Sequence, residues 1–170
     1  MEPDRLKIVV FGAFGAGKTT LIRTLDPASD HIEAPCAGGT TTIALDFGRV
    51  GIGERQVYLF GTPGQERFEF ARGIIGRGMD GAILLIDVTS PYDGFVDHLY
   101  KSLTETKIPF VVMMNKCDEI GARPDLIQQE IRSANVVRAS AKHRLECTAM
   151  LADFVATLPS GKHGQETIMH

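Results

Sequence analysis

A glycine-rich segment near the amino terminus constrains the fold of this chain more than any other feature. Residues 12–19 read Gly-Ala-Phe-Gly-Ala-Gly-Lys-Thr, which fits the pattern G-x-x-x-x-G-K-[ST]. A β-branched and aromatic run at 7–11 precedes the segment, and Leu21, Ile22 and Leu25 follow it at helical spacing. Strand, glycine turn and helix in this order bring backbone N–H groups and a helix N-terminus together around phosphate groups. The segment therefore predicts a phosphate-binding loop.

Two side chains of this loop have predicted chemical roles. Lys18 is expected to reach the β- and γ-phosphate oxygens of a nucleotide, and the Thr19 hydroxyl is expected to ligate Mg²⁺. The other predicted nucleotide contacts in this loop come from its backbone and from the next hydroxyl: Gly12, Phe14, Gly15, Ala16, Gly17 and Thr20. Composition alone would produce the four fixed positions in a chain of this length about 1% of the time. A plain glycine-rich turn is thus disfavoured.

The rest of the chain alternates between strand and helix patterns. Strands are expected at 43–50, 56–60, 81–86, 109–114 and 135–138, and helices at 92–105, 124–133 and 143–157. The first two of these strands are predicted to form an antiparallel hairpin around a short loop at 51–54. Such alternation predicts an α/β fold with a mainly parallel six-stranded sheet, one antiparallel edge strand and helices on both faces. We expect one domain over 1–158 and a mobile polar tail over 159–170.

Composition excludes several classes of protein. The net charge is -3 and no basic stripe is present, which argues against a nucleic-acid binder because duplex binding requires several neutralised phosphates. Three cysteines cannot all pair within the chain, and no charged-then-apolar leader follows the first methionine, so a cytoplasmic location is expected. The apolar runs are too short to span a membrane, and no lipidation motif is present. No direct membrane anchor is therefore predicted.

A second motif follows the predicted strand at 109–114. Asn115-Lys116-Cys117-Asp118 lies at the carboxyl end of that strand, where open α/β sheets bind ligands. The Asp118 carboxylate is able to accept hydrogen bonds from the N1–H and exocyclic amine of guanine, whereas adenine has an acceptor at the equivalent ring nitrogen. Asn115 is expected to hold neighbouring loops, and the stem of Lys116 to pack over the base. These residues predict a guanine site.

A loop after the last strand completes this site. It contains Ser140, Ala141 and Lys142, and the Ala141 N–H is a candidate donor to the guanine O6. With the phosphate loop, N-K-C-D and S-A-K in this order, the chain resembles the Ras superfamily of small GTPases over about residues 5–158. The resemblance implies a P-loop NTPase G domain that binds GTP and GDP with Mg²⁺ and hydrolyses GTP.

The segment Phe-Gly-Thr-Pro-Gly-Gln-Glu-Arg-Phe at 60–68 is similar to the second switch of this superfamily, particularly in prokaryotic members with proline before glycine. The resemblance implies that the Gly64 N–H contacts the γ-phosphate and that Gln65 orients the attacking water. Thr42 in Thr-Ile-Ala-Leu-Asp-Phe resembles the threonine of the first switch, which ligates Mg²⁺ and senses the γ-phosphate, with Thr40 and Thr41 as rivals. The predicted catalytic residues are thus Gln65, Lys18 and Thr42, and the predicted metal ligands are Thr19 and Thr42.

Two positions depart from the superfamily pattern. Gly61 replaces the aspartate that usually holds Mg²⁺ through water, and Asp46 and Asp87 are candidates for a substitute carboxylate, although Asp87 is also suited to capping a strand end. Phe14 stands where faster-hydrolysing members commonly have glycine, so its ring is expected to crowd Gln65. We therefore predict slow intrinsic hydrolysis that a partner accelerates.

Three functions fit these motifs. The leading hypothesis is a GTP-dependent switch, whose partners would include GTPase-activating and exchange proteins. The closest resemblance is to prokaryotic polarity-control and multi-protein-operon GTPases, whose regulators often have the roadblock fold. The natural partner surface combines arginine and aromatic residues of the second switch: Arg67, Phe68, Phe70 and Arg72. The alternatives are a pseudo-GTPase that holds guanine nucleotide as a structural ligand, and a small-molecule kinase or ATPase, which would not need N-K-C-D.

Overall fold

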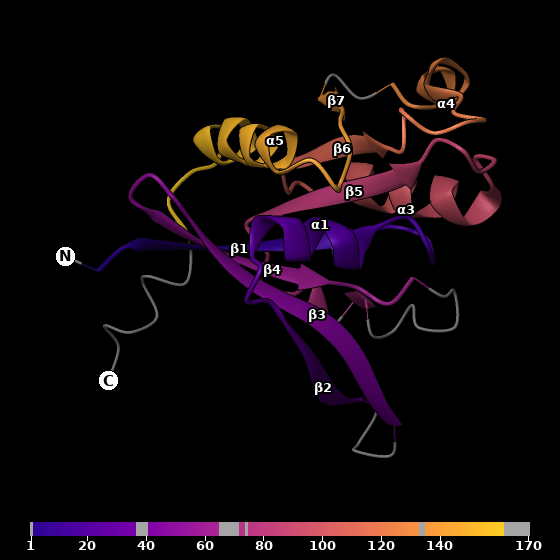
Figure 1. Cartoon of the computed structure of the whole chain (residues 1–170). Helices are drawn as coiled ribbons and strands as arrows, with labels where there is room; N and C mark the ends of the chain where they lie inside the picture. The colour runs from indigo at the N-terminus through magenta and orange to yellow at the C-terminus, as the bar shows by residue number, and fades with distance from the viewer. Residues whose placement is uncertain (1, 37–40, 65–71, 74, 133–134, 162–170) are drawn as a thin grey trace.

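A mainly parallel sheet forms the centre of the computed structural model (Figure 1). Over the described residues, 2–36, 41–64, 72–73, 75–132 and 135–161, the sheet has seven strands in the order β2-β3-β4-β1-β5-β6-β7. The strands are β1 (Asp4–Phe11), β2 (Asp30–Cys36), β3 (Thr41–Ile52), β4 (Arg55–Gly61), β5 (Gly81–Asp87), β6 (Phe110–Asn115) and β7 (Val136–Arg138). The helices are α1 (Lys18–Leu25), α3 (Gly94–Glu105), α4 (Pro124–Glu130) and α5 (Arg144–Ala156).

The strand pairing confirms the predicted α/β class and corrects the number of strands. β4, β1, β5, β6 and β7 run parallel, while β3 pairs antiparallel with β4. The prediction of six strands was wrong because β2 pairs antiparallel with β3 and takes the edge position. β2 contains Pro35, which an edge strand tolerates since one side of it needs no ladder hydrogen bonds.

The helices lie close to their predicted positions, and local chemistry explains their ends. α1 ends at Leu25, where the Asp26 N–H donates to the Ile22 carbonyl and Pro27 follows. α3 begins after Asp93, whose carboxylate accepts from the Val96 N–H at 3.0 Å. α4 ends at Glu130, three residues before the predicted end of that helix.

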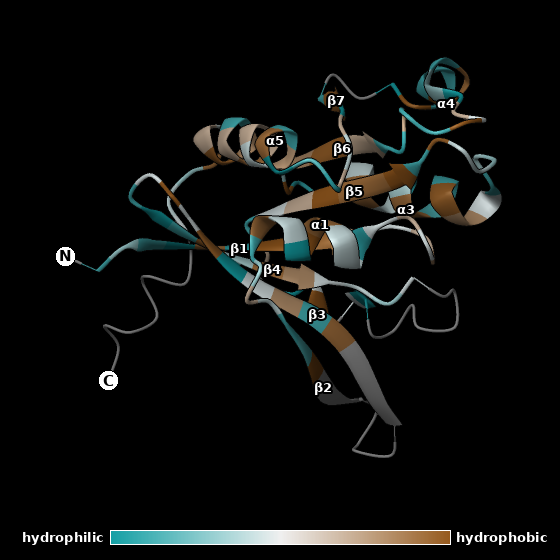
Figure 2. Ribbon diagram, viewed as in Figure 1, coloured by the Kyte–Doolittle hydropathy of each residue, from teal (hydrophilic) through white to brown (hydrophobic). Residues whose placement is uncertain are grey.

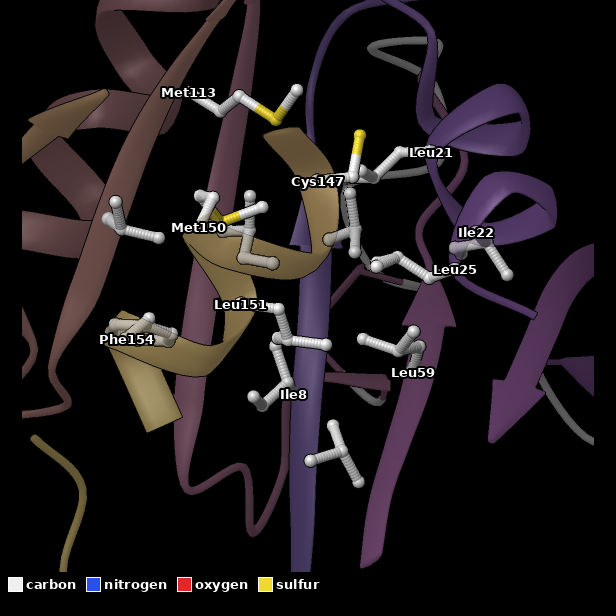
Figure 3. Close-up of a cluster of buried hydrophobic side chains, with 14 of the residues drawn as sticks. Ile8, Leu21, Ile22, Leu25, Leu59, Met113, Cys147, Met150, Leu151 and Phe154 are labelled. Carbon is white, nitrogen blue, oxygen red and sulfur yellow. The ribbon is translucent and has the colours of Figure 1, made fainter. Parts of the chain in front are cut away.

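Two apolar layers cover the two faces of the sheet. In β1, Ile8 and Val10 pack toward α1 and α5, whereas Val9 and Phe11 pack toward α3 and α4. Figure 2 shows the central strands as largely apolar, as expected for parallel strands buried on both faces. Figure 3 shows the first layer, in which side chains of α1 and α5 meet those of β1, β4 and β6. This packing leaves the carboxyl ends of the parallel strands for the loops that carry the motifs.

Arg55 ties the end of α5 to the start of the chain. Its guanidinium donates to the Val155 carbonyl at 2.7 Å and the Leu158 carbonyl at 2.9 Å, and it forms an ion pair with Asp4 at 2.9 Å. The Gly161 N–H donates to the same carboxylate at 2.8 Å. The first residues of the predicted tail are therefore held against β1, and the rest of the tail lies outside the described residues. None of the helices in the described part of the chain is long and apolar enough to cross a membrane.

Candidate functional site

The glycine-rich loop joins β1 to α1 at the carboxyl edge of the sheet. Gly17, the residue before α1, has φ of 109°, which is strained for any residue with a side chain. A Cβ at Gly17 would also lie 2.4 Å from the Asn115 side-chain nitrogen. Glycine is thus required here both by the backbone conformation and by the close approach of β6.

Lys18 lies over this loop and is 9% exposed. Its ammonium donates to the Gly12 carbonyl at 2.8 Å and to the Ala13 carbonyl at 2.9 Å. Burial lowers the pKa of Lys18 to about 8, with nearby Asp46 opposing this shift and Arg72 adding to it. The lysine is therefore a desolvated cation at the position where the sequence predicts contact with phosphates.

Asn115 links two loops to the end of β6 through one buried side chain. Its side-chain nitrogen donates to the Ala16 carbonyl at 2.9 Å, and its side-chain oxygen accepts from the Ala141 N–H at 2.8 Å. The residue ends β6 and is 3% exposed. The predicted role of Asn115 in holding neighbouring loops matches this geometry, because one amide spans the phosphate loop and the S-A-K loop.

Lys116 is the non-glycine residue with positive φ among the described residues, at 68°. Its ammonium donates to the Gly15 carbonyl at 3.0 Å and pairs with Asp87 at 2.8 Å. Burial raises the pKa of Asp87, but hydrogen bonds from Lys116 and Thr89 outweigh it and lower that pKa overall. Asp87 therefore belongs to the base side of the site.

The predicted base-binding residues line one hollow between these loops. The lining residues are Gly17, Thr20, Asn115, Lys116, Asp118, Glu119, Ser140, Ala141 and Lys142. Asp118 is exposed, and its carboxylate is thus accessible to a base edge. The structure brings together every residue that the sequence assigns to the base.

Two carboxylates of this region were missed by sequence reasoning. Glu146, in the first turn of α5, accepts from the Ser140 N–H at 2.9 Å and fixes the S-A-K loop. Glu119 lies 3.9 Å from the Lys142 ammonium. The position of Glu146 in the first helical turn is a signal for such a contact, since carboxylates there often meet free N–H groups.

The segment after β4 contacts the phosphate loop directly. The Phe14 N–H donates to the Gly64 carbonyl at 3.0 Å, and a Cβ at Gly64 would lie 2.7 Å from the Lys18 ammonium. The Phe14 side chain is 79% exposed. Gln65 lies outside the described residues, so its catalytic role and its crowding by Phe14 stay predictions.

The structure does not bring Thr42 to Thr19. Thr42 pairs with Pro35 in the hairpin of β2 and β3, four residues from Asp46, which corresponds to about 13 Å along the strand. Figure 1 shows this hairpin extending away from the helices. Asp46 instead meets Thr19, whose hydroxyl donates to the carboxylate at 2.5 Å. The role of Thr42 as a metal ligand beside Thr19 stays a prediction.

The donor set at Thr19 suits Mg²⁺, which prefers hydroxyl and carboxylate oxygens. In the part of the chain that the structure describes, no group of three or more His, Cys, Asp or Glu is placed to hold a metal ion. Mg²⁺ commonly binds through one or two protein oxygens together with phosphates and waters. Thr19 and Asp46 therefore fit a metal that is bound together with a nucleotide.

Arg72 corrects the predicted partner surface. The residue is 5% exposed, its guanidinium donates to the Pro63 carbonyl at 3.2 Å, and it lies 4.9 Å from the ring centre of Phe95. Arg72 was expected to be a surface anchor, but it packs inside the molecule. Arg67, Phe68 and Phe70 lie outside the described residues.

Comparisons with known proteins agree with this geometry. The family of the elongation factor Tu GTP-binding domain matches residues 4–163. An uncharacterized protein of Methanocaldococcus jannaschii is 36% identical over 69% of this chain and 74% of its own length. The Ras-related protein RABG1 of Arabidopsis thaliana is 33% identical over 77% of this chain and 68% of its own length.

A solved structure shares the fold. The small GTPase Arl6 of Trypanosoma brucei, with a bound nucleotide analogue, gives a TM-score of 0.69 over 90% of this chain and 96% of its own, at 17% identity. That identity supports the fold alone, whereas the family match covers nearly the whole chain. The chain therefore belongs to the elongation factor Tu GTP-binding domain family and is a GTP-binding G domain related to the Ras-like GTPases.

Proposed function

We propose that this protein is a molecular switch that binds GTP and GDP with Mg²⁺, hydrolyses GTP slowly and controls the binding of a partner. The observation that carries the proposal is the Asn115 side chain, which joins the phosphate loop at Ala16 to the S-A-K loop at Ala141. A site for either phosphate or base alone would not need this link. The link fixes the distance between the two halves of a guanine nucleotide site.

The described residues divide the work of binding between them. The Lys18 ammonium is placed to exchange its two loop carbonyls for phosphate oxygens, and phosphate charge favours its protonated form. The Asp118 carboxylate is placed to accept from the guanine edge, whereas the Ala141 N–H is held by the Asn115 oxygen at 2.8 Å and would have to share that bond with the guanine O6. Thr19 would hold Mg²⁺ together with the phosphates, and the ion would supply neutralisation of the phosphate charge. Gln65 orients the water that attacks the γ-phosphate.

The subclass and the partners form a finer part of the proposal. The Thr-Pro-Gly-Gln sequence at 62–65 supports a place among prokaryotic polarity-control GTPases, and thus regulation by GTPase-activating and exchange proteins, one of them with a roadblock fold. Slow hydrolysis follows from the same view, because a partner would supply or arrange the missing catalytic group. Thr42 would hold the metal in the GTP state, and its pairing with Pro35 implies that the outer part of the β2–β3 hairpin would have to unpair for this.

Base selectivity tests nucleotide binding. Purified protein is loaded with a fluorescent GDP analogue, and unlabelled GTP or ATP competes for the site. We expect GTP to compete at least about 10³-fold better than ATP, because adenine presents an acceptor at the ring nitrogen that would face the Asp118 carboxylate and leaves that carboxylate without its partner. Asp118→Ala should abolish this preference. Asp125→Ala removes an exposed carboxylate of α4 and should keep it. Equal competition by GTP and ATP in the wild type would refute a guanine site.

A single-turnover assay tests hydrolysis. Protein loaded with GTP and Mg²⁺ is denatured at timed intervals, and the retained nucleotide is separated by chromatography. We expect conversion to GDP at about 10⁻⁴ to 10⁻² s⁻¹, the range of intrinsic rates in related switches. Gln65→Ala should abolish the conversion. Retained GTP without any conversion, alone or with cell extract, would favour the pseudo-GTPase, for which Gly61 in place of aspartate is the supporting observation.

A further inference from the structure

We propose that Asp46, carried by β3, is the carboxylate that anchors Mg²⁺ in this protein and replaces the missing aspartate at position 61. The proposal rests on the proposed nucleotide binding and deepens it. It assigns a metal-anchoring role to a strand residue that lies outside the phosphate loop and outside the segment after β4. Three observations support it: the strand register, the contact with Thr19, and the partners of the rival carboxylate.

The register of β3 and β4 places Asp46 directly opposite Gly61. A Cβ at Gly61 would lie 3.4 Å from the Asp46 Cβ and 3.6 Å from its carboxylate oxygen. Directly opposed residues of an antiparallel pair project on the same face of the sheet. The Asp46 carboxylate therefore occupies the space that a side chain at position 61 would enter, and the two positions are alternative sources of one carboxylate.

The carboxylate is aimed at the phosphate loop. One oxygen of Asp46 accepts from the Thr19 hydroxyl at 2.5 Å, and the other lies 2.8 Å from His31 Nδ1. The Asp46 side chain is 14% exposed. His31 belongs to β2 and is a positioning residue, because it fixes the carboxylate from the far side. The Thr19 hydroxyl and the Asp46 carboxylate thus bring two hard oxygen donors from two different elements to the same place.

Asp87, the other candidate, is committed elsewhere. One of its oxygens accepts from the Lys116 ammonium at 2.8 Å, and the other accepts from the Thr89 N–H at 2.8 Å and its hydroxyl at 2.5 Å. Its partner across the sheet is Asn115, on the base side of the site. These contacts distinguish the two carboxylates that the sequence left open, and they favour Asp46.

The test measures how Mg²⁺ slows the release of a fluorescent GDP analogue from the full chain. The release rate in EDTA divided by the rate in Mg²⁺ defines a metal response, and a Mg²⁺ titration gives the concentration for half of it. Asp46→Asn should raise that concentration about 10- to 100-fold, the usual loss when an outer partner of a metal site is removed. Asp30→Asn is the matched control, since it removes an exposed carboxylate from the neighbouring strand without changing the site.

A cross-strand exchange provides the second variant. Asp46→Gly combined with Gly61→Asp moves the carboxylate to the opposite strand, and the Ile22 methyl 3.1 Å from the new Cβ has to shift slightly. We expect the exchanged protein to respond to Mg²⁺ at lower concentration than Asp46→Gly alone. Both variants are compared by circular dichroism to verify folding.

Each outcome decides the proposal. An unchanged Mg²⁺ titration in Asp46→Asn would overturn it, as would faster release in EDTA and Mg²⁺ alike with the same ratio, because that pattern indicates structural damage. An exchanged protein that needs no less Mg²⁺ than Asp46→Gly would also overturn it. A wild-type protein that retains no GDP analogue under either condition would instead refute the proposed function.

Discussion

Asn115→Ala should destabilise the protein even without nucleotide, because both hydrogen bonds of the side chain are internal. The change leaves the Ala16 carbonyl and the Ala141 N–H without this partner in a region where Asn115 is 3% exposed. An orphaned buried polar group costs about 1–3 kcal/mol, so the two together should lower the free energy of unfolding by about 2–4 kcal/mol. For a domain of this size that loss corresponds to a Tm lower by about 5–15 °C.

The assay is urea unfolding of nucleotide-free protein, followed by circular dichroism because the chain has no tryptophan. Leaving nucleotide out matters since a ligand that binds the folded state adds its own stabilisation. Gln129→Ala, which removes an exposed amide from α4, should change stability by less than about 0.5 kcal/mol. A loss below about 1 kcal/mol in Asn115→Ala, with an unchanged denaturant slope, would show that the bridge between the loops is not held by this side chain.

Three further predictions concern other parts of the structure. Gly64→Ala should cost about 1–3 kcal/mol of folding stability in the same urea assay, because its Cβ would lie 2.5 Å from the Phe14 nitrogen; a neutral result would contradict that contact. Arg55→Met should cost about 2–3 kcal/mol, since the guanidinium holds Asp4 and the end of α5, and a protease should then cut the carboxyl terminus sooner. Burial raises the pKa of Cys147 to about 11, so iodoacetamide should label this thiol slowly at pH 8. The labelling rate should rise about tenfold per pH unit up to that pKa. Fast labelling of Cys147 at pH 8, located by mass spectrometry, would refute its burial.

Much of the fold and most of the site follow from local patterns in the sequence. The buried runs of β5 and β6 and the helical spacing after Lys18 predict the central elements because burial on both faces requires apolar residues there. The motifs lie at strand ends, so their convergence follows from the parallel topology. These parts of the prediction depend only on neighbours along the chain.

The sequence predicts the register of the strands less well, because strand register depends on pairing between segments. The expected hairpin loop at 51–54 would place Asp46 opposite Leu59, whereas the observed turn at 53–54 pairs Ile52 with Arg55 and places Asp46 opposite Gly61. A two-residue turn is the commonest hairpin connection, and Gly53 with φ of 60° permits it. That turn was therefore the signal that could have separated Asp46 from Asp87 as the substitute carboxylate.

The edge strand and Arg72 show two other limits. β2 alternates Ile32, Ala34 and Cys36 with other residues, but Pro35 argues against a strand there, so its pairing with β3 identifies it as one. An arginine such as Arg72 is a residue type common at partner surfaces. In the structure it instead contacts Phe95 and the Pro63 carbonyl, and no local sequence pattern predicts these contacts. The burial of Arg72 depends on Phe95, which is distant in the sequence. The missed strand β2 depends on its pairing with β3 at the edge of the sheet.

The position of Asp46 on β3 also determines where an exchange factor would have to bind in order to weaken nucleotide binding. β3 is paired on both sides, with β2 and with β4, so a rearrangement of the chain beyond Gly64 would leave the carboxylate in place. Separation of β2 from β3 would instead remove His31 from Asp46, and the carboxylate could then rotate away from Thr19. We therefore expect an exchange factor to speed nucleotide release by binding at the exposed edge of the sheet and separating β2 from β3. Release would then not depend on changes in the chain beyond Gly64 after hydrolysis.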